Sequence, residues 1–126
     1  MKTELEYKEK MAKLRANWAR AKSMLDEGKA SAIQAIIQTH GLKISKTGFL
    51  FCQLQMQDLG LDGLPYLDCK TFKGWKENGF IVDKGQKSNI DGITWITCQK
   101  KENKEQSYMV PKAYHLFHRS QVHPID

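Results

Sequence analysis

The segment Thr3–Glu27 constrains the fold most, because its apolar side chains recur at alternating steps of four and three. This spacing places them on one narrow stripe of a helix, which Gly28 can end in a left-handed conformation. The stripe can pack on the rest of the domain or form a homodimer as a short coiled coil, and the small number of heptads favours packing. It consists of Tyr7, Met11, Leu14, Trp18, Ala21 and Leu25.

Further helices are predicted in the next part of the chain. Residues 30–39 form a second helix with Ile33, Ile36 and Ile37 on its buried side, and Gly41 ends it. The stretch 41–47 then reads as a loop. Residues 49–59 fit both the alternation of a strand and the patch of a helix, and we favour the helix because Gly60 can close it.

A capped helix and a glycine turn are predicted between residues 71 and 88. Thr71 can cap a short helix over 72–78, and Gly79 ends it. The residues Phe80–Val82 then begin an extended stretch, and 83–88 form a tight basic turn.

The last third of the chain has the pattern of antiparallel strands. The segment 93–98 has a strand pattern, in which Ile93, Trp95 and the small Thr97 alternate with Thr94, Ile96 and Cys98. A polar loop follows at 100–105, and 107–110 form the returning strand. After Pro111 a further strand is predicted over 113–118. The fold class is therefore α+β, with N-terminal helices followed by a small antiparallel sheet. We expect a helical segment 1–28, a possible dimer or partner surface, and a binding domain 29–126.

The composition favours a negatively charged partner and a reducing compartment. The formal charge is +6, and nucleic acid is the commonest partner of a basic domain. Three separated cysteines without a CxxC pair fit unpaired thiols in the cytoplasm. The charged N-terminus is no signal peptide, and no apolar run is long enough to span a membrane.

No constellation of catalytic residues stands out, so we expect a protein that is not an enzyme and needs no cofactor. The carboxylates are scattered, and neither HExxH nor GxSxG occurs. The four histidines lack the spacing of zinc ligands. A metal-dependent enzyme would need bound zinc, which elemental analysis would detect.

A basic cluster with interleaved rings is the strongest binding signal. Cations offset phosphate charge while aromatic rings stack on unpaired bases, which is what a single strand needs. A tryptophan on a short amphipathic helix is more often part of the core, however, and the lysines also fit a solvated face. The cluster comprises Lys70, Lys73, Lys76, Lys84 and Lys87 with Phe72, Trp75 and Phe80.

The turn after this helix is a candidate phosphate contact. Gly85 lets backbone amides approach a ligand, and successive amides in a turn can hold a phosphate oxygen. The same residues also fit a plain surface turn between two strands. The turn is formed by Lys84, Gly85, Gln86, Lys87 and Ser88.

Two stretches together resemble the N-terminal domain of ArdC-type antirestriction proteins. The first runs from Leu64-Pro65-Tyr66 through Thr71-Phe72-Lys73-Gly74-Trp75 to Lys84-Gly85-Gln86-Lys87, and the second runs from Val110 to Val122 and contains Tyr114 and Ser120-Gln121. The likeness covers about 48–122, with a poor match near 89–106. Unlike those proteins, this chain contains no zinc-binding metalloprotease motif, so peptidase activity is not carried over.

The resemblance implies an α+β domain that binds single-stranded DNA, as in plasmid, conjugation and phage proteins that evade host defence. It implies that Trp75, the turn 84–87 and Arg119, Ser120 and Gln121 lie near the nucleic acid. We predict phosphate contacts from the five lysines and Arg119, and stacking by Trp75, Phe80 and Tyr114, unless these rings belong to the core. The alternative is a small inhibitor that docks on a host nuclease or defence complex. RNA in place of DNA, and a homodimer through the stripe of the first helix, also stay open.

Overall fold

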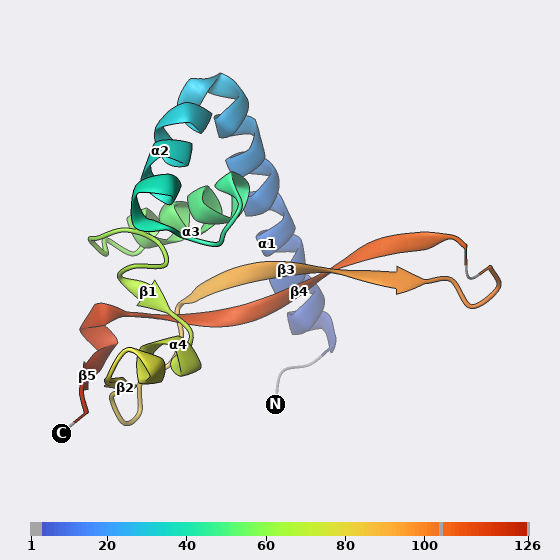
Figure 1. Ribbon diagram of the computed structural model, residues 1–126. Helices are drawn as coiled ribbons and strands as arrows, with labels where there is room; N and C mark the ends of the chain where they lie inside the picture. Colours follow the sequence, from blue (N-terminus) through green and yellow to red (C-terminus); the bar gives the residue numbers. More distant parts are fainter. Residues whose placement is uncertain (1–3, 104, 126) are drawn as a thin grey trace. The chain divides into compact units, whose positions relative to one another are not determined.

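The computed structural model describes residues 4–103 and 105–125 (Figure 1). The chain forms two compact units, Met1–Tyr66 and Leu67–Asp126, which we describe separately. The first contains the three longest helices, and the second contains the sheets with two short helices, so the predicted α+β class is confirmed. In the described part of the chain, no helix is long and apolar enough to cross a membrane.

The first unit consists of three helices, α1 (Glu4–Met24), α2 (Ala30–His40) and α3 (Lys46–Asp58). The chain kinks between α1 and α2 at η1 (Leu25–Lys29), where Gly28 has a φ of 101°. Gly41 ends α2 in the left-handed conformation, as predicted. The segment 49–59 is helical, also as predicted, but α3 begins earlier, because the Ser45 hydroxyl caps it by accepting from the Gly48 N–H.

The apolar stripe of α1 packs inside this unit. Met11, Leu14 and Ala21 are buried, and Trp18 meets Phe51 of α3 edge to face with ring centroids 5.4 Å apart. Only Tyr7, at the start of the stripe, is largely exposed. The packing alternative is therefore confirmed, and the stripe is not a free surface for a coiled-coil dimer.

The boundary between the compact units lies after Tyr66 and not after residue 28. The physical reason is the contact between α1 and α3, which joins the first helix to the next two. The residues predicted to bind nucleic acid all belong to the second unit.

The second unit is built on a long hairpin of β3 (Ile90–Gln99) and β4 (Ser107–His118). β1 (Cys69–Lys70) pairs with the end of β4, and β2 (Phe80–Val82) pairs with β5 (Val122–Pro124). The short helices α4 (Phe72–Glu77) and η2 (Arg119–Gln121) connect these strands. The small elements gather at one end of the hairpin, and its distal half extends away from them (Figure 1).

β4 runs without interruption through Pro111, whereas two separate strands were predicted. The N–H of Lys100 donates to the carbonyl of Gln106, and from this pair onward hydrogen-bonded and non-hydrogen-bonded pairs alternate along the hairpin. Pro111 lies opposite Trp95, in a non-hydrogen-bonded pair. Its nitrogen therefore faces the outer edge of β4, so the proline removes no hydrogen bond from the ladder between β3 and β4.

Tyr114 lies across the hairpin from Gly92, and its ring covers the glycine. A Cβ atom built on Gly92 would lie 2.1 Å from Cζ of Tyr114. The lack of a side chain at residue 92 is thus what allows the ring to lie on the strand.

Gly92→Ala is expected to lower the free energy of unfolding by about 1–3 kcal/mol, because the Tyr114 ring must leave its place. Denaturant unfolding of the two single variants and of Gly92→Ala with Tyr114→Ala measures the coupling. The alanine at residue 92 should cost little once the ring is gone. An equal cost in both backgrounds would show that the ring contact is not the cause.

Candidate nucleic-acid interface

Trp75 is part of the core of the second unit. Only 5% of its surface is exposed, and its indole Nε1–H donates to the carbonyl of Phe117 at 2.7 Å. Thr71 caps α4 by accepting from the Gly74 N–H, as predicted, and α4 carries the indole inward. The alternative of a core tryptophan is therefore the correct one, and the ring is not available to stack on a base.

The other two rings predicted to stack are also engaged within the unit. Phe80 meets Trp75 edge to face at 5.4 Å between ring centroids, and it is half-buried. Tyr114 is half-buried over Gly92. These rings consolidate the second unit and leave only part of their surface accessible.

Phe72 is the exposed ring beside the basic cluster, which the sequence analysis did not single out as a stacking residue. Its exposed fraction is 49%, and it lies in the first turn of α4 beside Lys73. The signal available in the sequence was its position one residue after the cap, in the first turn of the helix.

The five lysines divide into two groups. The ammonium of Lys70 lies over the Trp75 ring, 5.6 Å from its centroid, and Lys73 forms an ion pair with Glu77 at 3.9 Å. Lys76, Lys84 and Lys87 are exposed. Within the described part of the chain, these last three lysines form no ion pair.

The turn after β2 has the predicted form. The N–H of Gln86 donates to the carbonyl of Asp83 at 3.1 Å, and Gly85 has a φ of 84°, which favours glycine. Among the described residues, the N–H groups of Lys84, Gly85 and Lys87 have no acceptor. Two exposed cations and three N–H donors are therefore available on one short turn.

Gln121 fixes this turn from the inside. Its side chain is buried, and Nε2 donates to the carbonyl of Lys87 at 2.8 Å and to Oε1 of Gln86 at 3.2 Å. Its own carbonyl accepts from the Asp83 N–H at 2.8 Å. The side-chain Oε1 also accepts from the N–H of His118, which starts η2. The segment Arg119–Gln121 thus meets the turn 84–87, although more than thirty residues separate them in the chain.

Arg119 and Ser120 are exposed next to this anchor, but each has a local partner. The Arg119 guanidinium contacts the Asp68 carboxylate at 3.3 Å, and the backbone N–H of Arg119 donates to the backbone carbonyl of Asp68. The Ser120 hydroxyl lies 2.8 Å from Nδ1 of the buried His118. Half of the Arg119 side chain is accessible, so it can add to the charge of the turn.

The predicted residues are therefore brought together in part. Lys84, Gly85, Gln86 and Lys87 form an exposed turn that Gln121 supports from below. The helix α4 contributes Lys73 and Lys76 as separate exposed cations, while Trp75 supports the fold. Charge alone does not single out this unit, since each unit contains ten Lys and Arg against seven Asp and Glu.

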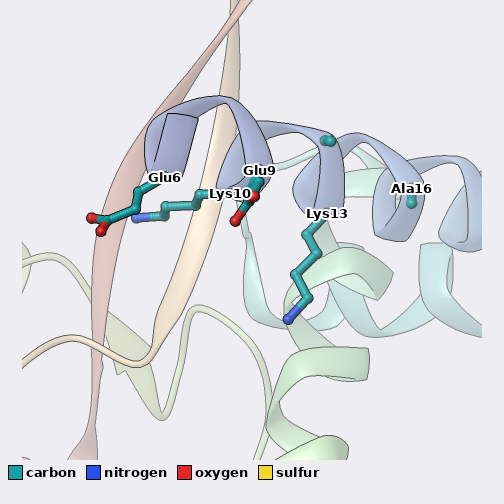
Figure 2. A pocket seen from close by; sticks show the side chains of 6 residues that line it. Glu6, Glu9, Lys10, Lys13 and Ala16 are labelled. Atoms are coloured by element: carbon teal, nitrogen blue, oxygen red, sulfur yellow. The ribbon is translucent and has the colours of Figure 1, made fainter. Parts of the chain in front are cut away.

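The described residues were also searched for a metal site and for a pocket. No group of three or more possible metal ligands occurs among them. A shallow depression on α1 is formed by one helix alone (Figure 2). Its lining mixes acidic, basic and small residues, namely Glu6, Glu9, Lys10, Ala12, Lys13 and Ala16. None of these was predicted to contact nucleic acid.

No known protein family, no curated protein and no solved structure matches this chain.

Proposed function

We propose that the unit Leu67–Asp126 binds single-stranded DNA through the turn 84–87. The observation that supports this proposal is the anchored turn itself, which combines two exposed lysines with three unoccupied N–H donors. Cations and backbone amides are the groups that hold phosphate oxygens. Because Gln121 fixes the backbone beforehand, little conformational freedom is lost on binding.

The proposed complex leaves a role for one ring. Phe72 can stack on an unpaired base beside the lysines of α4, whereas the bases of a duplex are already stacked on each other. Arg119 adds a cation beside the anchor. By the resemblance to ArdC-type domains, we further propose that the binding serves a phage or plasmid against host defence. We place the protein in the cytoplasm, which suits three cysteines that form no disulfide among the described residues.

Fluorescence anisotropy with labelled single-stranded DNA, duplex DNA and RNA of equal length tests this proposal. Lys84→Glu with Lys87→Glu is expected to weaken binding of single-stranded DNA by about tenfold or more. It should also reduce the slope of log affinity against log salt by roughly 1–2.

Lys100→Glu with Lys101→Glu is the matched control, since it changes the net charge equally in the hairpin loop. Equal losses in both double variants would mean that only net charge matters. Absence of binding at micromolar protein, or an affinity that ignores salt, would refute the proposal.

A further inference from the structure

The side-chain amide of Gln121 fits its surroundings in only one orientation. Its Oε1 accepts from the backbone N–H of His118 at 3.0 Å, and its Nε2 donates to the backbone carbonyl of Lys87 at 2.8 Å. Exchanging the two ends of the amide would place N–H against N–H and oxygen against oxygen. Because Gln121 is only 8% exposed, such mismatched contacts would be costly, so the orientation is fixed.

This orientation determines that of the Gln86 side chain. The Nε2 of Gln121 also donates to Oε1 of Gln86, at 3.2 Å. Since Nε2 is a donor, the atom that it meets on Gln86 has to be the acceptor oxygen, and the NH2 group of Gln86 is left for other partners. Gln86 is exposed, and within the described part of the chain this NH2 group has no acceptor.

The side chains of the turn 84–87 therefore offer donors to a ligand. The Gln86 NH2 group joins the ammonium groups of Lys84 and Lys87 and the three backbone N–H groups described above. The acid at the start of the turn, Asp83, contacts Nδ1 of His123 in β5. Phosphate oxygens only accept hydrogen bonds, so a set of donors and cations matches them. The glutamine contact that reads adenine needs the amide oxygen as well as the nitrogen, and here the oxygen is turned toward Gln121.

We propose that the turn 84–87 is a phosphate-binding site that does not read bases, and that the NH2 group of Gln86, oriented by Gln121, is one of its donors. The proposal rests on the proposed function where the phosphate belongs to a DNA strand. A free phosphate ion has the same chemistry, so the two sources are separated by experiment.

Nuclear magnetic resonance of the isotope-labelled full chain tests the class of ligand. Inorganic phosphate should shift the side-chain NH2 signal of Gln86 together with the backbone amide signals of Lys84, Gly85 and Lys87. Thymidine, which has a base but no phosphate, should leave these four signals in place. An abasic oligonucleotide, which has phosphates but no bases, should shift them as an oligo-dT of equal length does.

Gln86→Glu tests the donor while keeping the anchor. One carboxylate oxygen can still accept from Nε2 of Gln121, but the other replaces the NH2 group with a negatively charged acceptor. The affinity for single-stranded DNA should fall by about tenfold. The factor should be the same for oligo-dA, oligo-dC and oligo-dT, because losing a phosphate contact weakens binding uniformly across sequences.

Gln106→Glu is the matched control, since it makes the same change at an exposed glutamine beside the hairpin loop. It should alter the affinity by less than about twofold, because salt screens distant surface charges. A loss with Gln86→Glu that is confined to one base, or that is no larger than the loss with Gln106→Glu, would overturn the proposal. So would signals of the turn that respond to thymidine but not to inorganic phosphate.

Failure of this proposal and failure of the proposed function give different results. DNA binding that depends on Lys84 and Lys87 but not on Gln86 would overturn the role of Gln86 and retain the proposed function. If the turn responds to inorganic phosphate in a chain that binds no oligonucleotide, the phosphate site is supported and the proposed function is refuted.

Discussion

Replacing Trp75 by alanine is expected to lower the free energy of unfolding of the second unit by about 3–5 kcal/mol. The variant loses a buried ring that packs on Phe80, and it leaves the carbonyl of Phe117 without its indole donor. Since domains of this size are stable by only about 5–15 kcal/mol, such a loss should bring this unit close to unfolding. Denaturant titration followed by circular dichroism measures the change.

Trp75→Phe separates the two contributions. It retains an aromatic ring in the core and removes the N–H donor, so the expected loss is about 1–3 kcal/mol. A Trp75→Ala variant that keeps its stability but no longer binds single-stranded DNA would contradict the core assignment. That result would restore the tryptophan as a stacking residue.

Replacing Gln121 by leucine is expected to cost about 2–4 kcal/mol and to release the turn 84–87. The leucine fills a similar volume but leaves the carbonyl of Lys87 and the N–H of His118 without their partners. Buried groups that lose a hydrogen bond each cost about 1–3 kcal/mol. Thermal unfolding measures the cost, and hydrogen exchange of the amides of residues 83–88 reports whether the turn opens.

Ser120→Ala is the neighbouring control, because this exposed hydroxyl bonds only locally, to His118. We expect a loss of less than about 1 kcal/mol. If Gln121→Leu costs no more than Ser120→Ala, the glutamine does not anchor the turn. If Gln121→Leu opens the turn while DNA affinity stays the same, a fixed turn is not required for binding.

These two substitutions also bear on the proposed function in different ways. Trp75 supports the helix that presents Phe72, Lys73 and Lys76, and Gln121 supports the turn that presents Lys84 and Lys87. The structure thus separates residues that build the surface from residues that can touch a ligand. The sequence analysis predicted Trp75 and Gln121 as contacts together with the exposed lysines, because periodicity and composition do not distinguish a buried side chain from an exposed one.

Local signals in the sequence determined most of the secondary structure. The caps at Thr71 and the glycines at 28, 41 and 85 act through hydrogen bonds and backbone angles within a few residues, so they can be recognised without the fold. The alternation in β3 likewise predicted a strand. Pro111 was misleading, because whether a proline interrupts a strand depends on which side of the ladder its nitrogen faces.

Tertiary structure alone decided which of these residues are accessible and which lie together. The burial of Trp75, the ring of Tyr114 over Gly92 and the contact of Gln121 with Lys87 join segments about 20 to 40 residues apart. Such contacts depend on strand register and on the packing of whole elements, neither of which a local pattern encodes. The sequence by itself determined where the helices, the turn and the cations lie along the chain. Only the folded chain decided that the turn is exposed and anchored and that the tryptophan is buried.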